Sequence, residues 1–433
     1  MNIPSIEQAT ESQIKAFQEE KLQEALQYVA VNSPYYKKLF KEKGIDVNAV
    51  KTLEDLAKLP VTTKEHLQEY NDDFLCVPKS HIIDYTTTSG TSGKPVTFGL
   101  TDKDLDRLAY NEAISFICSG IKEGDVVQLM TTIDRRFMAG LAYFLGLRKI
   151  KAGVIRVGAG VPELQWDSIL KYKPSYLIAV PSFLLKLIEY AEAHNIDYNA
   201  SGIKGVVCIG EPLRNQDFSM NTLAEKITDK WDIKLFSTYA STEMSTAFAE
   251  CEYLCGGHQH PELIITEILD EHDNPVTDGG VGELAVTTLG VEGMPLVRFK
   301  TGDIVQLHTE PCSCGRTSYR VGPVVGRKQQ MIKYKGTTLY PPAMIDLLRS
   351  FPDIENHIIE ISTNDLGTDE ILIRAASKNP SESLLAEIKD HFRAKLRVTP
   401  KIVFASADEL NSIMFNPMSR KPVNFIDKRS LAF

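Results

Sequence analysis

The chain has 433 residues, 43% of them hydrophobic, so it is long enough to form two or three domains with sizeable cores. Its formal net charge of -9, without a dense basic run interleaved with aromatic residues, argues against nucleic-acid binding. Seven cysteines are too few for a disulfide scaffold at this length, and no N-terminal segment resembles a signal peptide. No run approaches the roughly 20 apolar residues of a membrane span, so we expect a cytosolic protein without membrane contact.

The first 60 residues are predicted to be helical. Apolar side chains recur there at helical spacing among charged ones, and Asn32-Ser33-Pro34 interrupts the pattern. No motif in this region indicates chemistry.

A segment rich in hydroxyl groups and glycine follows, between the apolar stretches Ile82-Ile83 and Val96 to Leu100. It consists of Thr86, Thr87, Thr88, Ser89, Gly90, Thr91, Ser92, Gly93 and Lys94. Glycines let consecutive backbone N–H groups point at one anion, and the hydroxyls and the lysine add donors. Only two residues separate the glycines, so this is not the common P-loop. We predict a polyphosphate-binding loop; a flexible linker, which has the same composition, is the alternative.

Helical patterns alternate with short apolar strands from Asp104 to Leu213, which predicts a parallel sheet covered by helices. The expected strands are 126–130, 153–157, 176–180 and 205–209. Short turn-rich strands follow from Leu263 to Leu307 and predict a β-rich subdomain.

The pattern changes again after Gly326-Arg327, to that of a compact α+β module. Its expected elements are a first strand, a helix at 342–349, strands at 357–362 and 370–376, a helix at 381–396 and a strand at 401–405. The predicted fold class is therefore α/β. It comprises a large N-terminal domain, with parallel sheets covered by helices and a β-rich subdomain, and a small α+β C-terminal domain.

Five more motifs accompany the hydroxyl-rich segment. They are Gly210-Glu211-Pro212, the run from Ser237 to Glu243, the run Pro295-Leu296-Val297-Arg298-Phe299-Lys300-Thr301-Gly302-Asp303, Gly326-Arg327 followed by Lys335-Gly336, and Lys421 within 419–429. In this order and spacing the set resembles the adenylate-forming superfamily of acyl-CoA synthetases, adenylation domains and luciferases. The form of the Pro295 to Asp303 run, the element Cys312 to Arg316 and the segments Asn32 to Tyr36 and Leu59 to Lys64 are similar to the phenylacetate-CoA ligase family.

The resemblance implies an ATP-dependent carboxylate-CoA ligase. Such an enzyme attacks the α-phosphate of ATP with a carboxylate, expels pyrophosphate and passes the acyl group from the acyl-adenylate to the thiol of CoA. The implied co-substrates and ions are ATP, CoA and Mg²⁺, and the partner is a small carboxylic acid. Two alternatives stay open: an adenylating or nucleotidyl-transferring relative without a CoA step, of the coenzyme F-390 synthetase kind, and a zinc-stabilised nucleotide-binding protein that has lost catalysis. The residues leave the oligomeric state open, with a homodimer as one option.

The same resemblance assigns the nucleotide site. It places the segment from Thr86 to Lys94 at the β- and γ-phosphates, Thr242 beside the α-phosphate and Glu243 on Mg²⁺, for which a carboxylate is a suitable hard ligand. The wall of the adenine pocket would be formed by Gly210, Glu211, Pro212, Tyr239, Ala240 and Ser241. Asp303 and Arg327 would bind the ribose. Arg298 could instead be a buried structural arginine and ranks below Asp303.

Two assignments concern the second half of the chain. Lys421 matches the family lysine that bridges the carboxylate and the phosphate oxygens, although a solvated lysine in the tail is the alternative. The resemblance also implies a domain boundary, with 1–327 as the adenylate-forming domain and 328–433 as a small mobile lid. The hinge position two residues after Arg327 is Gln329 in this chain, where the family usually has Asp or Lys.

The cysteines predict a separate structural zinc site. Cys312 and Cys314 offer two thiolates, and Cys251, Cys255, His258 and His260 lie upstream. Three cysteines and one histidine close a tetrahedral zinc site. Some members of the family look similar there, which favours Cys251, His258, Cys312 and Cys314; Cys255 or His260 could substitute, and the alternative is a set of reduced cysteines.

The acid itself is the least defined part of the prediction. Members of the family that act on phenylacetate have a small aromatic segment at the position where this chain has Asp134-Arg135-Arg136 before Phe137. If these side chains face the acyl pocket, a polar or additionally charged acid becomes the better fit. If they face solvent, they do not discriminate between acids, and phenylacetate is the default.

Overall fold

The computed structural model describes residues 2–88, 95–276, 279–334, 337–364, 368–415 and 422–429. The chain divides into two compact units. The first is Met1–Met220, Ala224–Thr301 and Val305–Pro323, and the second is Asn221–Leu223, Gly302–Ile304 and Val324–Phe433. Within the described ranges, no helix is both long enough and apolar enough to cross a membrane.

The N-terminal region is helical, as the sequence predicts. Its α-helices are α1 (Glu11–Asn32), α2 (Pro34–Lys43) and α3 (Lys64–Glu69), and its 3₁₀ turns are η1 (Ser5–Gln8), η2 (Val47–Ala49), η3 (Glu54–Lys58), η4 (Asn71–Phe74) and η5 (Lys79–His81). Thr10 and Gln13 form a capping box at the start of α1. The side chain of Ser33 caps α2, with Pro34 in its first turn, so the chain breaks and restarts its helix at the predicted interruption.

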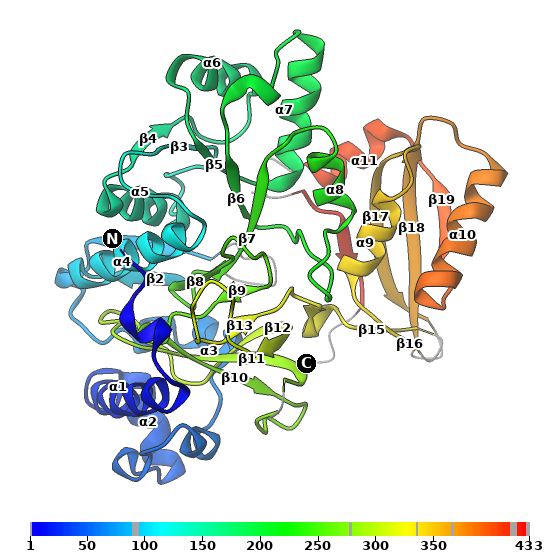
Figure 1. Ribbon diagram of the computed structural model, residues 1–433. Helices are drawn as coiled ribbons and strands as arrows, with labels where there is room; N and C mark the ends of the chain where they lie inside the picture. Colours follow the sequence, from blue (N-terminus) through cyan, green and yellow to red (C-terminus); the bar gives the residue numbers. More distant parts are fainter. Residues whose placement is uncertain are drawn as a thin grey trace. The chain divides into compact units, whose positions relative to one another are not determined.

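The parallel part of the first unit alternates strands and helices. Its elements are α4 (Asp102–Cys118), β3 (Val126–Leu129), α5 (Met138–Ile150), β4 (Gly153–Arg156), α6 (Pro162–Tyr172), β5 (Tyr176–Ala179), α7 (Pro181–Ala193), η6 (Asn199–Ser201), β6 (Gly205–Ile209), α8 (Thr222–Thr228) and β7 (Lys234–Ser241). Strands β4, β3, β5, β6 and β7 lie side by side and run parallel, which confirms the four strands expected from 126 to 209 (Figure 1). Helices α4 and α5 cover one face through Phe116, Tyr143 and Leu147, which pack on Val127 and Ile178.

The rest of the first unit is β-rich, also as predicted. Its strands are β1 (Asp84–Thr87), β2 (Thr97–Leu100), β8 (Thr246–Ala249), β9 (Gly257–His258), β10 (Ile264–Leu269), β11 (Val281–Thr288), β12 (Phe299–His308) and β13 (Arg320–Val321). Strands β1 and β2 form a separate antiparallel pair. The others continue the large sheet beyond β7 in the order β8, β9, β13, β12, β11, β10, with β7 and β8 antiparallel.

The second unit is a small α+β module. Its elements are β14 (Gly326–Arg327), η7 (Lys328–Gln330), β15 (Ile332–Tyr334), β16 (Thr337–Leu339), α9 (Pro341–Arg349), β17 (Ile354–Thr363), β18 (Asp369–Ser377), α10 (Glu382–Leu396), β19 (Lys401–Phe404), α11 (Ala407–Met414) and β20 (Phe425–Asp427). A sheet in the order β19, β18, β17, β20 forms its centre. Every element predicted after residue 327 is present, and the strand expected before the first helix is the hairpin of β15 and β16. Helix α11 and strand β20 were not predicted.

Candidate functional site

The hydroxyl-rich segment begins inside a strand. Thr86 and Thr87 belong to β1 and are 1% and 5% exposed, so the loop that was predicted from Thr86 onward starts later than expected. The backbone N–H of Thr87 donates to the carbonyl of Arg136 at 3.0 Å, and Thr88 accepts from the N–H of Val96 through its side chain. Ser89, Gly90, Thr91, Ser92, Gly93 and Lys94 lie outside the described residues, and their phosphate-binding role stays a prediction.

Two of the predicted adenine-pocket segments leave the large sheet side by side. Ile209 at the end of β6 pairs with Thr238 of β7, so 210–212 and 239–243 follow neighbouring strand positions. Gly210 and Pro212 are exposed, and Gly210 has a φ of 78°, a conformation that glycine adopts without strain. In open α/β sheets the carboxyl ends of parallel strands are the edge where ligands bind. The fold therefore brings these two motifs together at a suitable edge.

Glu211 has a structural partner that the sequence did not indicate. Its carboxylate accepts a hydrogen bond of 2.8 Å from the backbone N–H of Ser182, in the first turn of α7. A carboxylate at a helix N-terminus satisfies a free N–H group and interacts favourably with the helix dipole. The side chain of Glu211 thus ties α7 to the end of β6.

Tyr239, Ala240 and Ser241 are the last residues of β7, and Thr242 and Glu243 lie in the turn that connects β7 to β8. The ring of Tyr239 stacks on Phe248, with centroids 5.8 Å apart, because the two residues are cross-strand partners. Thr242 and Glu243 are both partly exposed. The turn therefore presents a hydroxyl and a carboxylate next to an aromatic face.

Asp303 and Arg327, the two predicted ribose residues, lie together in the second unit. They are register partners on β12 and β14, and Arg327 Nε is 3.4 Å from Asp303 Oδ1. The side chain of Asp303 is 15% exposed and that of Arg327 is 54% exposed. Both can therefore meet a ligand from the solvent side.

Arg298 is a buried structural arginine, which was the alternative to a ligand role. Its Nη1 donates to the carbonyl of Leu59 at 2.8 Å, its Nη2 donates to that of Asp273, and its Nε lies 3.1 Å from Glu267 Oε1. Burial raises the pKa of Glu267, and the neighbouring Arg298 lowers it in opposition. The guanidinium joins three separate segments of the first unit.

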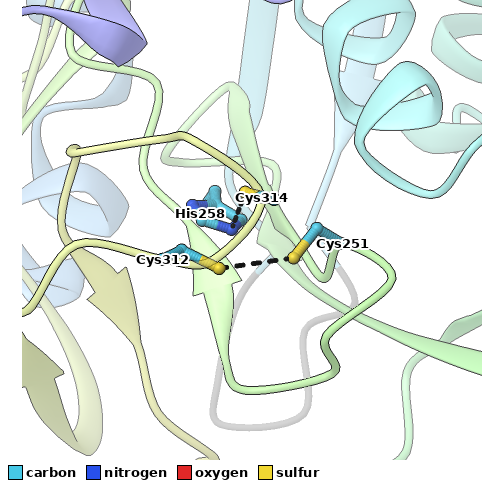
Figure 2. Close-up of side chains that lie close together, drawn as sticks. All are labelled: Cys251, His258, Cys312 and Cys314. Carbon is cyan, nitrogen blue, oxygen red and sulfur yellow. Dashed lines mark hydrogen bonds between the residues drawn. The ribbon is translucent and has the colours of Figure 1, made fainter.

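The four residues favoured as metal ligands converge on one point (Figure 2). The ligand atoms of Cys251, His258, Cys312 and Cys314 all lie within 4.8 Å of one another. Cys251 Sγ is 3.6 Å from Cys312 Sγ, and Cys314 Sγ is 3.5 Å from His258 Nε2. A tetrahedral zinc ion would separate two sulfurs by about 3.8 Å and a sulfur from a nitrogen by about 3.6 Å, given its usual bond lengths. The spacing of the cluster fits such an ion.

The two alternative ligands have other surroundings. Both ring nitrogens of His260 are engaged, Nδ1 with Glu7 Oε1 at 2.5 Å and Nε2 with the hydroxyl of Ser115 at 3.0 Å. Cys255 Sγ lies 3.8 Å from Cys312 Sγ, at the border of the cluster. The geometry thus favours His258 over His260 and leaves Cys255 as a neighbour of the ligand set.

A buried ion pair supports the cluster. Arg316 Nη1 lies 3.5 Å from Cys314 Sγ, and Arg316 Nε lies 2.6 Å from Glu7 Oε2. Hydrogen bonds with Cys251, His258 and Arg316 lower the pKa of the Cys314 thiol to about 2, although burial opposes this. The thiolate is the form of cysteine that binds metal. Glu7 belongs to η1, so the beginning of the chain packs against the cluster.

Lys421 and the pair Lys335-Gly336 lie outside the described residues, and the role of Lys421 stays a prediction. Gln329, the position at which a hinge is expected, lies in the 3₁₀ turn η7. The guanidinium of Arg429 donates to the carbonyl of Gln329 at 3.1 Å and to that of Met331 at 2.8 Å. Arg429 therefore fastens the turn to the segment that follows β20.

The segment 134–136, which the resemblance places near the acyl pocket, is exposed at all three side chains. Arg135 and Arg136 have φ angles of 60° and 57°, a left-handed conformation that non-glycine residues rarely adopt. Exposure agrees with the case in which these side chains face solvent, and their part in the choice of acid stays a prediction. The backbone carbonyl of Arg136 accepts a hydrogen bond from the N–H of Thr87, which links this segment to β1.

Sequence reasoning missed a buried polar face on α4. Arg107, Asn111, Ser115 and Cys118 are all nearly inaccessible, and each makes a hydrogen bond to the segment 245–260. The spacing of four, four and three residues is a helical stripe that could have revealed one common face. A polar stripe on a helix usually faces solvent, so polarity alone does not reveal this burial.

Comparison with known proteins gives these features a context. A model of the AMP-binding enzyme family matches residues 14–292. The phenylacetate-coenzyme A ligase of Thermus thermophilus is 28% identical over 87% of this chain and 84% of its own length. The phenylacetate-coenzyme A ligase of Aromatoleum evansii is 28% identical over 93% of this chain and 92% of its own length.

Solved structures agree at the level of the fold. The crystal structure of 2-hydroxyisobutyryl-CoA ligase in the postadenylation state, in complex with 2-HIB-AMP, matches with a TM-score of 0.86 at 24% identity, over 98% of this chain and 92% of that one. The same ligase with 2-HIB-AMP and CoA in the thioesterification state matches with a TM-score of 0.71 at 25% identity, over 99% and 92%.

These matches confirm the expected fold class and the resemblance to adenylate-forming ligases. They also confirm the expected reaction class, an ATP-dependent acid–thiol ligase that forms an acyl-CoA by way of an acyl-adenylate, and they do not favour the alternatives without a CoA step. The family model covers well over half of the 433 residues. The chain belongs to the AMP-binding enzyme family.

Proposed function

We propose that this enzyme activates a small carboxylic acid, with an aryl acid such as phenylacetate as the first candidate, and transfers it to CoA. The observation that carries the proposal is the strand-end arrangement, in which Gly210 to Pro212 and Tyr239 to Glu243 adjoin at the ligand-binding edge of a parallel sheet. The choice of phenylacetate as the first candidate acid rests on relatives named phenylacetate-coenzyme A ligase. They align over most of this chain.

The first half-reaction joins a carboxylate oxygen of the acid to the α-phosphorus of ATP and breaks the bond to the bridging oxygen, so that pyrophosphate leaves. In our assignment, Thr86 to Lys94 hold the leaving pyrophosphate, and Tyr239 offers its ring to the adenine. Glu243 would hold Mg²⁺, which neutralises phosphate charge when bound. Lys421 would neutralise charge where the carboxylate meets the α-phosphate.

In the second half-reaction, the CoA sulfur attacks the acyl carbon as its thiol proton passes to solvent, and AMP leaves. Asp303 and Arg327 would hold the ribose hydroxyls through both steps, the carboxylate as acceptor and the guanidinium as donor. The nucleotide therefore stays bound while the acyl acceptor changes.

A second candidate substrate class is a dicarboxylic acid. Two adjacent arginines, Arg135 and Arg136, are tied to β1 through Thr87, and a second carboxylate could pair with a guanidinium there. Relatives named oxalate–CoA ligase, in Saccharomyces cerevisiae, and fumarate–(S)-2,3-diaminopropanoate ligase, in Enterobacter agglomerans, align at 21% and 24% identity. The exposure of both arginines is the reason that the aryl acid stays first.

The experiment is carboxylate-dependent pyrophosphate exchange with an acid panel, followed by CoA. The panel contains phenylacetate, benzoate, 2-hydroxyisobutyrate, oxalate and fumarate. We expect the highest kcat/KM with an aryl acid; Arg135→Gln with Arg136→Gln should then leave it within about threefold. A preference for oxalate or fumarate that the double variant removes would select the second class. No exchange with any acid and no AMP formation would contradict the proposal.

We further propose that Cys251, His258, Cys312 and Cys314 hold a structural zinc ion. The support is a set of soft ligands at tetrahedral spacing, with the thiolate form of Cys314 favoured by its neighbours. Four protein ligands leave no open position for a substrate, so the ion would link the segment around 251–258 to that around 312–314. We expect about one equivalent of zinc per chain after purification without chelators.

The matched control for zinc is Cys76→Ser, because Cys76 is buried outside the cluster. It should keep its zinc, whereas Cys312→Ser should lose it. Less than about half an equivalent in the wild-type protein would count against the site.

We also propose that the enzyme acts in the cytoplasm, where ATP and CoA are available, which cell fractionation tests. That the enzyme forms a homodimer stays a prediction, which light scattering can test.

A further inference from the structure

Helix α4 packs along β8, the strand that begins just after the turn at Thr242 and Glu243. Along the helix, Arg107 donates to the carbonyl of Ser245, Asn111 accepts from the N–H of Ala247 and Cys118 donates to the carbonyl of Ala249. The partners on the strand advance by two residues at a time. Since alternate residues of a strand point the same way, one polar face of α4 binds one side of the segment 245–249.

Arg107 makes the largest set of these contacts. Its Nη1 donates to Ser245 O at 2.5 Å, its Nη2 donates to the hydroxyl of Thr246 at 3.1 Å and to Leu263 O at 2.6 Å, and its Nε donates to Leu289 O at 2.7 Å. All four acceptors are neutral oxygens. The side chain is buried, and burial lowers the pKa of the guanidinium to about 10, so Arg107 carries its charge at neutral pH.

Asp104 and Glu262 are near enough to raise the pKa of Arg107, but the four hydrogen bonds of its guanidinium go to neutral oxygens. Burial of the charge costs free energy, and these hydrogen bonds offset the cost only while the oxygens stay in place, so the guanidinium fixes their positions. The position fixed here is strained. Ser245 has a φ of 48°, which costs a residue with a side chain of the L configuration energy unless its surroundings hold it. The backbone carbonyl oxygen of Ser245 accepts the hydrogen bond from Arg107. Met244 also holds the turn, because its side chain is fully buried and its N–H donates to the hydroxyl of Ser241 at 3.3 Å.

We propose that Arg107 is a positioning residue for adenylation: it fixes the turn that carries Thr242 and Glu243 and places a buried positive charge beneath it. This inference rests on the proposed roles of Thr242 and Glu243. In this inference, Arg107 affects the first half-reaction, in which negative charge develops on the phosphate, and it does not contact the substrate directly. Lysine cannot replace it, because one ammonium group cannot reach oxygens on 245, 263 and 289 as the guanidinium fork does.

The test separates the two half-reactions in Arg107→Lys. The first is pyrophosphate exchange with Mg²⁺ varied, and the second is thioester formation from synthetic acyl-adenylate and CoA. We expect exchange to fall at least 30-fold and the Mg²⁺ concentration for half-maximal rate to rise at least fivefold, while thioester formation stays within threefold of wild type. A purely structural role would lower both half-reactions together.

Two further variants keep the test decisive. Arg298→Lys is the matched control, since Arg298 is also a buried arginine bound to backbone carbonyls, and it should not change the ratio of the two rates. Thr246→Val removes one acceptor and no charge, and should lower exchange by three- to tenfold even if Arg107→Lys fails to fold. Equal effects on both half-reactions in Thr246→Val, or wild-type exchange in a folded Arg107→Lys, would overturn the inference. If the wild-type enzyme shows no exchange with any acid, the proposed function fails instead, and calorimetric binding of MgATP to these variants still tests Arg107.

Discussion

Asp303 and Arg327 form a cross-strand pair in which Nε of the arginine is 3.4 Å from Oδ1 of the aspartate. More than half of the Arg327 side chain is exposed, so the pair contributes less than about 1 kcal/mol to stability. The exposed side of this weak pair is that of Arg327, and there we propose that a ribose approaches.

Asp303→Asn should therefore impair nucleotide binding without unfolding the protein. The amide loses the charge that accepts hydrogen bonds from the ribose, so we expect the KM for ATP in pyrophosphate exchange to rise at least about tenfold. The matched control is Asp390→Asn, which breaks the exposed pair with Arg393 in the same unit. An unchanged KM for ATP in the Asp303 variant would refute the ribose assignment.

Glu7→Gln should weaken metal retention. The Glu7 carboxylate contacts both Arg316 and His260 in a fully buried position, and Arg316 contacts the sulfur of Cys314. Changes in groups that orient metal ligands typically cost 10- to 100-fold in affinity, so zinc release to a chromogenic chelator should accelerate by at least about tenfold. Glu11→Gln, an exposed change nearby, is the control; equal release rates in both variants would contradict the role of Glu7.

Glu112 should make stability fall with rising pH. The side chain is fully buried in α4, and burial raises the pKa of its carboxyl from 4.5 to about 8, against the lowering effect of a hydrogen bond from Asn111. The folded protein thus holds this proton more tightly than the unfolded chain does. The stabilisation is complete below about pH 4.5 and is lost as the pH rises to about 8.

Glu112→Gln keeps the acceptor oxygen and removes the titration. We expect the variant to be more stable than wild type at pH 8, by about 2–4 kcal/mol, and to match it near pH 4.5. Urea unfolding at a series of pH values measures this difference, with the exposed Glu42→Gln as the control. A wild-type pH slope that persists in Glu112→Gln would show that another group causes it.

Lys421→Ala should lower the rate of adenylation more than a substitution at any neighbouring residue does. If Lys421 neutralises charge between the carboxylate and the α-phosphate, its loss should lower pyrophosphate exchange by at least about 100-fold. Arg420→Ala tests the adjacent cation and should stay within about threefold of wild type. Wild-type exchange in Lys421→Ala would refute its role.

Much of the fold could be predicted because local patterns and tertiary packing agree. The strand at 205–209 is apolar throughout and is buried at all five positions, so its sequence left little choice. The break at Asn32-Ser33-Pro34 was predicted for the same reason, since serine caps and proline begins a helix. The extra elements α11 and β20 are short, and short apolar runs resemble loops in sequence.

The residues alone predicted the composition of the metal cluster, whereas the choice of His258 over His260 came from the family resemblance. His258 and His260 are two residues apart, and only the contacts of His260 with Glu7 and Ser115 separate them. Those partners come from distant segments, which no local pattern reveals. Arg107 escaped notice for a related reason, because its polar stripe indicates a solvated face unless the position of the 245–249 segment is known.

The most direct measurement of the central claim is the product balance of the complete reaction. Purified enzyme is incubated with ATP, Mg²⁺, CoA and the acid that gives the fastest pyrophosphate exchange, and AMP, pyrophosphate and acyl-CoA are quantified together. An AMP-forming acyl-CoA ligase produces the three in equal amounts, with none formed when the acid is omitted. Release of ADP, or AMP and pyrophosphate without loss of the CoA thiol, would contradict the assignment.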